Sequence, residues 1–140
     1  MTQKADVVLI GGGIVGAACA YYLCQAGLDV HLLERGAPAS GTSRACDGLI
    51  LLWDKSAGAE LVLGLSSVQL WSQLNDSLDR DFGYHRCGTI FLAADEQSLI
   101  EGQRKAELLG EYGVSTQIVD RQGLPSLEPL LAPDLAGGVY

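Results

Sequence analysis

The sequence is poor in basic residues and in the side chains that bind metals. Its 9 Lys and Arg residues stand against 17 Asp and Glu residues, which gives a formal net charge of −8 at pH 7. This charge repels nucleic-acid phosphates and anionic lipid surfaces, so we expect no nucleic-acid partner. The two histidines and four cysteines contain no C-x-x-C pair and no zinc-ligand spacing. We therefore expect no metal site and reduced thiols.

Long apolar runs are lacking as well. The longest nearly uncharged stretch, residues 7–28, is interrupted by three consecutive glycines, which argues against a transmembrane segment. Asp6 enters this stretch and no small-residue cleavage site precedes it, so we expect no secretory signal. These absences favour a cytoplasmic protein and leave peripheral membrane association open. Apolar residues nevertheless make up 48% of the 140 residues, enough for a globular core.

The first third of the chain predicts a strand, a helix and a second strand. Residues 7–10 form a continuous apolar run, typical of a strand buried on both faces of a parallel sheet. A helix begins near Ile14 and ends at Gly27, where a left-handed residue is tolerated. Residues 30–34 predict the second strand. This order is that of a βαβ unit.

The rest of the chain predicts a mixture of helices and strands. A small, polar loop spans residues 36–48, and a helix over 57–80 carries apolar residues at steps of three and four. Six of these residues are expected to face a core: Leu61, Leu65, Val68, Trp71, Leu74 and Leu78. After them we expect a strand over 88–93, a helix from Asp95 to Gly113 and a strand over 114–119. The proline-containing tail permits only short helical turns and extended links.

A glycine-rich motif lies between the first predicted strand and helix. Gly11 permits a tight turn, Gly13 lets backbone N–H groups approach a pyrophosphate, and Gly16 lets helix and strand pack closely. The positive end of the helix would face the anion. The motif G-x-G-x-x-G reads Gly11-Gly12-Gly13-Ile14-Val15-Gly16. It predicts a dinucleotide-binding site.

An acidic residue completes this fingerprint. Glu34 lies 23 positions after Gly11, where an acid binds ribose hydroxyls and repels the 2′-phosphate of NADP. Arg35 is a further candidate for cofactor contact, although strand alternation is expected to direct its side chain to the other face. The motif and the acid do not separate FAD from NAD, because both cofactors contain the same ADP half.

A resemblance to a known protein family distinguishes between FAD and NAD. Residues 6–34, followed by Gly41-Thr42-Ser43-Arg44-Ala45-Cys46-Asp47-Gly48, resemble the N-terminal part of the flavin-dependent D-amino-acid oxidase family, which includes glycine and sarcosine oxidases and D-amino-acid dehydrogenases. The weaker similarity of residues 84–90 and 127–140 extends it over essentially the whole chain. It implies FAD as cofactor and contacts of Thr42, Ser43, Arg44 and Gly48 with it.

Two positions depart from this family's pattern. Ala45 stands where some relatives carry a flavin-linking His, so covalent attachment there is not expected. Asp47 replaces a small residue, and we expect it either to hydrogen-bond the loop backbone or to influence flavin redox behaviour. The Ala-Cys-Asp-Gly variant is most similar to β subunits of opine or D-hydroxyproline dehydrogenases, so other subunits are candidate partners.

The resemblance implies an α/β fold and an incomplete protein. We expect a Rossmann-like βαβ FAD-binding domain over residues 1–82 and the start of an α+β substrate domain over 83–140. The chain is then an N-terminal fragment whose catalytic residues lie beyond residue 140. The implied reaction is hydride transfer to flavin from the carbon that carries nitrogen in an amino acid or secondary amine. An NAD-binding dehydrogenase module and a non-catalytic truncated chain are the alternatives.

Overall fold

The computed structural model describes residues 4–140, which divide in sequence into two compact units. The first unit ends at Leu49, and the second begins at Ile50 and ends at Tyr140. This division reflects compactness, and the expected boundary between cofactor and substrate domains at residues 82 and 83 stays a prediction.

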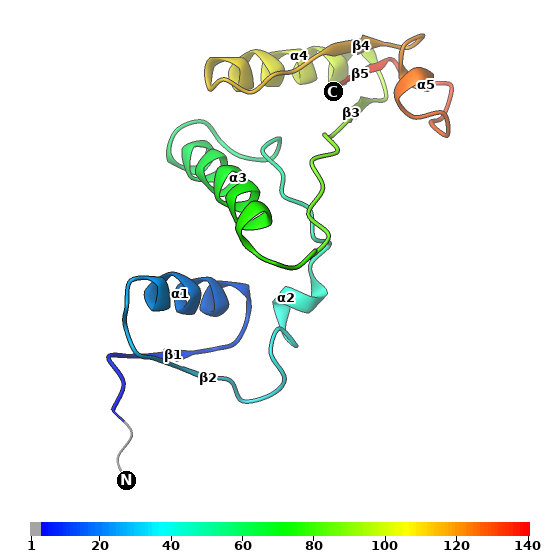
Figure 1. The fold of residues 1–140 in the computed structure, drawn as a ribbon. Coiled ribbons are helices and arrows are strands. Elements are labelled where there is room, and N and C mark those ends of the chain that lie inside the picture. The colour runs from blue at the N-terminus through cyan, green and yellow to red at the C-terminus, as the bar shows by residue number, and fades with distance from the viewer. Residues whose placement is uncertain (1–3) are drawn as a thin grey trace. The chain divides into compact units, whose positions relative to one another are not determined.

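The first unit is the predicted βαβ unit (Figure 1). Strands β1 (Val7–Ile10) and β2 (Val30–Leu33) are parallel, and α1 (Ile14–Gln25) connects them. Gly27 has φ +84° and stops α1, as expected of a residue without a Cβ. A short helix, α2 (Thr42–Ala45), lies in the segment predicted to be a loop. The prediction of an α/β fold with a Rossmann-like start is confirmed.

Within residues 4–49, only one face of this two-stranded sheet is covered. Leu9 and Leu32 are register partners, and α1 lies on their side, since Gly16 of α1 approaches the Leu32 side chain. On the other face Val8 is 56% exposed and Ile10 is 89% exposed. The expected burial of β1 on both faces is therefore not found within residues 4–49, because α1 covers a single face of the sheet.

The second unit contains a three-stranded antiparallel sheet in the order β3 (Phe91–Ala93), β5 (Gly137–Val139) and β4 (Ile118–Asp120). Helix α4 (Glu96–Glu111) packs on one face, where its Gly102 lies against Phe91 and Val139. Asp95 begins α4 with a capping box, in which its carboxylate accepts from the Ser98 N–H. The other helices of this unit are α3 (Ala59–Ser77) and α5 (Leu124–Leu127).

The elements of this unit are shorter than the sequence predicts. Helix α3 covers 59–77 of the predicted 57–80; of the six apolar positions Leu61 is buried, Leu78 is exposed and the other four are half-buried. The strand predicted over 88–93 begins at Phe91, and Gly88, its predicted first residue, has φ +80° and is not extended. The strand predicted over 114–119 covers only 118–120. Loops replace the remaining strand positions.

Strand β5, the central strand of this sheet, is not expected from the sequence. Two glycines and neighbouring prolines disfavour a strand, so the tail was expected to form only turns and extended links. A Cβ on Gly138 would lie 2.5 Å from the Phe91 carbonyl oxygen, and one on Gly137 would lie 2.7 Å from the Val119 carbonyl oxygen. Close approach of both neighbouring strands therefore requires glycine there.

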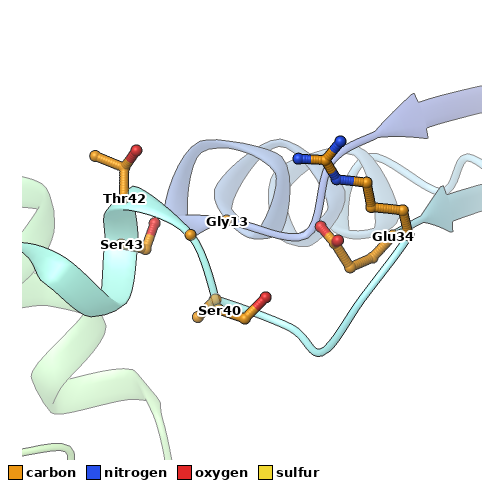
Figure 2. A pocket seen from close by; sticks show the side chains of 8 residues that line it. Gly13, Glu34, Ser40, Thr42 and Ser43 are labelled. Carbon is orange, nitrogen blue, oxygen red and sulfur yellow. The ribbon is translucent and has the colours of Figure 1, made fainter.

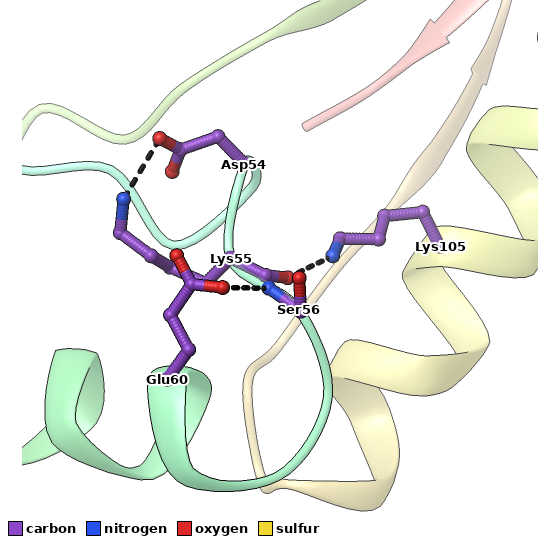
Figure 3. A network of polar contacts seen from close by, with 5 residues as sticks. All are labelled: Asp54, Lys55, Ser56, Glu60 and Lys105. Atoms are coloured by element: carbon purple, nitrogen blue, oxygen red, sulfur yellow. Dashed lines mark hydrogen bonds and ion pairs between the residues drawn. The ribbon is translucent and has the colours of Figure 1, made fainter.

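A polar network links the start of α3 to α4 (Figure 3). The Lys105 ammonium donates to the Lys55 carbonyl, and the Lys55 ammonium pairs with Asp54 at 2.8 Å. At the start of α3 the Ser56 N–H donates to Glu60 at 2.9 Å. The contacts of Lys105 and Glu60 satisfy backbone groups of the linking segment, and the Lys55–Asp54 pair is an exposed ion pair between neighbouring residues.

The contact between α1 and β1 gives a first prediction. A Cβ on Gly16 would lie 1.9 Å from the Gly11 carbonyl oxygen, so the backbone would have to move to make room for it. We expect Gly16→Ala to lower the free energy of unfolding by about 3 kcal/mol, measured by denaturant unfolding. Gly110→Ala, in α4 where a Cβ would meet no other atom within 4 Å, is the control and is expected to raise stability by up to about 1 kcal/mol. Equal effects of the two substitutions would contradict the close-packing role.

Candidate cofactor-binding site

The site is built on the glycine turn between β1 and α1. Gly11 has φ +108°, and its N–H donates to the Leu33 carbonyl at 2.8 Å, which holds the turn at the carboxyl ends of both strands. Gly13 is the N-terminal cap residue of α1 and, lacking a side chain, makes no capping hydrogen bond to the first N–H groups of the helix. The first N–H groups of α1 therefore point out of the sheet edge, where parallel α/β sheets bind their ligands.

The Glu34 carboxylate lies directly beside this turn. Its Oε2 accepts from the Gly12 N–H at 2.7 Å, and its Oε1 accepts from the Gly36 N–H at 2.8 Å. The Gly12 N–H, and after it the Gly36 N–H, stabilise the charged form and lower the pKa of Glu34 below its ordinary value of 4.5. The carboxylate is thus ionised and held in one orientation without any ligand.

Ser43 returns the chain to the start of α1. Its Oγ accepts from the Ile14 N–H at 2.9 Å, across 29 positions of sequence. The Ala39 N–H donates to the Gly12 carbonyl at 2.8 Å. Both contacts hold residues 36–43 against the glycine turn.

These segments enclose one pocket (Figure 2). Glu34 lies at one end of the loop, and Thr42 and Ser43 lie at the other, beside Gly13. A carboxylate suits a sugar diol, and hydroxyl groups at a helix N-terminus suit an anion. The lining residues are Gly13, Glu34, Arg35, Ala39, Ser40, Gly41, Thr42 and Ser43.

Five of the expected site residues line this pocket and seven do not. Those in the lining are Gly13, Glu34, Arg35, Thr42 and Ser43. Those outside it are Gly11, Gly12, Ile14, Val15, Gly16, Arg44 and Gly48; the first five form the turn and the start of α1. Contact of all twelve with FAD stays a prediction.

The pocket also holds residues that no sequence motif singled out. Ala39 and Ser40 line it, and the small, polar composition of this loop was the available signal. Gly41 lines it as well, and it is the first residue of the loop segment that carries the family resemblance. Arg35 lines the pocket together with Glu34, although strand alternation was expected to separate the two side chains. Strand β2 ends at Leu33, so alternation does not extend to Glu34 and Arg35.

Asp47 makes a local contact. Its Oδ1 accepts from the Leu49 N–H at 3.3 Å, an Asx-type turn and the first of the two roles expected for this acid. The Cys46 thiol donates to the Ser43 carbonyl at 3.2 Å. Neither side chain lines the pocket.

Two negative observations apply to residues 4–140. No three His, Cys, Asp or Glu side chains gather there in a way that would hold a metal ion. Within the same residues no helix has the length and apolar character needed to cross a membrane.

Comparison with known proteins assigns the family. The model of the family described as FAD dependent oxidoreductase matches residues 6–140. The chain belongs to this family. The FAD dependent oxidoreductase family is the one that the sequence resembles, and FAD rather than NAD is its cofactor. Glu34, Gly13 and Ser43 fit that cofactor, since they offer a diol acceptor and an anion site within one pocket.

Individual relatives support the same assignment. The chain is 36% identical over 142 residues to the pyruvate dehydrogenase phosphatase regulatory subunit of Mus musculus, covering 100% of the chain and 16% of that protein. It is 34% identical to the sarcosine oxidase subunit beta of Arthrobacter sp, covering 92% of the chain and 32% of that subunit. The crystal structure of glycine oxidase from Geobacillus kaustophilus matches with a TM-score of 0.86 and 28% identity, covering 99% of the chain and 39% of that enzyme. The chain thus spans well under half the length of these relatives.

The hydrogen bonds of Glu34 predict a pH-dependent contribution to stability. Its lowered pKa in the folded state means that the contribution is complete above about pH 4.5 and is lost as the pH falls through the folded-state pKa. We expect Glu34→Gln to lower the melting temperature at pH 7, and the difference from wild type to shrink below about pH 4.5. Thermal unfolding between pH 3 and pH 7 measures it. Glu111→Gln, at the end of α4, is the control, and the prediction fails if both variants show the same pH profile.

Proposed function

We propose that the chain binds FAD in this pocket and belongs to an enzyme that oxidises a C–N bond of an amino acid or secondary amine. The observation that carries the proposal is the ionised Glu34 carboxylate, held at the glycine turn of a member of the FAD dependent oxidoreductase family. The relatives named for sarcosine and glycine oxidation support the substrate class.

Glu34 is suited to the adenosine ribose. Each of its oxygens accepts one backbone N–H, and a carboxylate oxygen has lone pairs for a second donor. The ribose hydroxyls can therefore donate to Glu34 while the carboxylate keeps its place. Its negative charge also disfavours a 2′-phosphate at this position.

The start of α1 and Ser43 are suited to the pyrophosphate. Because the Ser43 Oγ accepts from the Ile14 N–H, its own proton is free to be donated to a phosphate oxygen. The Ser43 hydroxyl then offers a hydrogen-bond donor in the pocket beside the positive end of the α1 dipole. Thr42, in the same lining, adds a second hydroxyl.

When bound, FAD supplies the two-electron acceptor for the substrate. The residues described here bind and orient the cofactor, and no catalytic base is assigned among them. The relatives' names fit glycine, sarcosine or another N-methylated glycine as the substrate. The resemblance also implies a D-amino acid, D-hydroxyproline or an opine as a substrate. We expect residues 1–140 alone to turn over substrate weakly or not at all.

The protein's surroundings are also part of the proposal. We propose a small amino-acid or amine substrate, a cytoplasmic location and assembly with other subunits. The name of the Arthrobacter relative, a beta subunit, supports a heteromeric enzyme. The domain limits 1–82 and 83–140 belong to the same proposal.

A regulatory role is the second candidate function. It is favoured by the 36% identity with a protein named as a regulatory subunit. In this case the pocket would bind FAD without a substrate that reduces it.

The first experiment identifies the cofactor. The complete protein is purified, its absorption spectrum is recorded, and the compound released by denaturation is compared with FAD. We expect FAD, with an affinity that Glu34→Gln lowers about ten- to a hundredfold and Ser43→Ala about fivefold, as one charge-assisted and one neutral hydrogen bond would. Asp47→Ala is the control, with affinity and flavin reduction potential unchanged, because this side chain does not line the pocket and its one hydrogen bond is to the Leu49 N–H, outside the lining. Absence of flavin after reconstitution with excess FAD would overturn the proposal.

A second experiment separates the two candidate functions. The FAD-loaded protein is mixed anaerobically with glycine, sarcosine, dimethylglycine, D-amino acids, D-hydroxyproline and opines, and loss of flavin absorbance is followed. Bleaching by one of them identifies an oxidoreductase and its substrate. FAD binding without bleaching by any of them favours the regulatory role.

A further inference from the structure

The pocket loop contains an alanine in a backbone conformation that favours glycine. Ala39 has φ +59°, and it is the one non-glycine residue among residues 4–140 with a positive φ. The Ser40 N–H donates to the Ala37 carbonyl at 3.2 Å, which closes a four-residue turn with Pro38 and Ala39 at its centre. Proline followed by a residue with positive φ is the pattern of a type II turn, where glycine is the usual third residue.

This turn holds the loop against the glycine turn. The Ala39 N–H donates to the Gly12 carbonyl at 2.8 Å, while the Gly12 N–H donates to Glu34. Ala39 also lines the pocket, beside Ser40. The path of the loop from Glu34 to Ser40 (Figure 2) therefore includes a residue whose Cβ opposes its backbone conformation.

A strained position of this kind affects ligand affinity when the loop has other conformations available. For a ligand that needs the formed loop, the apparent dissociation constant is the intrinsic constant divided by the fraction of molecules in which the loop is formed. Glycine at position 39 removes the Cβ and raises that fraction. A β-branched residue lowers it, since positive φ is least accessible to such side chains.

We propose that Ala39 is a positioning residue whose methyl group lowers the fraction of molecules in which the pocket loop is formed, so that FAD binding raises that fraction. This inference rests on the proposed function, since it concerns the same site. It differs from a packing role for the Ala39 methyl group in the sign of its effect: loss of the methyl group tightens cofactor binding rather than weakening it.

The test compares Ala39→Gly with Ala39→Val in the complete protein. The apoprotein is titrated with FAD, and the change in flavin fluorescence gives the dissociation constant. We expect Ala39→Gly to lower the dissociation constant by about two- to fivefold and Ala39→Val to raise it by at least that factor. Ala37→Gly removes a methyl group from the same loop at a position without positive φ, so it is the matched control and is expected to change the constant by less than about twofold.

The possible outcomes distinguish failure of this inference from failure of the proposed function. Tighter binding by Ala39→Gly alone supports the inference, even where Ala39→Val does not fold. Unchanged or weaker binding by Ala39→Gly overturns it, while the wild-type affinity for FAD keeps the proposed function intact. A shift in the melting temperature of the apoprotein without a change in affinity also overturns it, because it shows a structural role only. If wild-type protein does not bind FAD, both the proposed function and the inference are overturned.

Discussion

The close approach of α1 to the end of β1 is the constraint on which the site depends. Gly16 lies so near the Gly11 carbonyl that a larger residue would force the backbone to shift, and with glycine there α1 begins directly after the turn. The backbone N–H of Gly12 then donates to Glu34, and the backbone carbonyl of Gly12 accepts from the Ala39 N–H. The pocket follows from that arrangement, because both partners come from the segment after β2.

The sequence was sufficient for the features that depend on local pattern. The βαβ unit follows from an apolar run, a helix with a glycine stop and a second apolar run, and it has the expected order and nearly the expected limits. The place of Glu34 follows from its spacing after Gly11, and the turn role expected of Asp47 follows from the behaviour of a short acid in a loop.

Features set by long-range pairing or by an unusual backbone could not be predicted in the same way. Strand β5 consists of residues with little strand preference, and it is specified by close neighbours on both sides rather than by its own side chains. Ala39 was not singled out because alanine gives no sign of a positive φ. The pocket-lining position of Arg35 depended on where β2 ends, and strand ends are poorly defined by sequence.

The two backbone hydrogen bonds of Glu34 link folding to the cofactor-selecting role that we propose for this residue. An engineer who wished this site to accept a phosphorylated dinucleotide would remove the acid, and would thereby leave the Gly12 and Gly36 N–H groups without their acceptor. Glutamine can replace one of the two acceptor oxygens and not the other. A change of specificity at this position therefore needs a second substitution that repairs the loop, which makes the acid difficult to exchange by single steps.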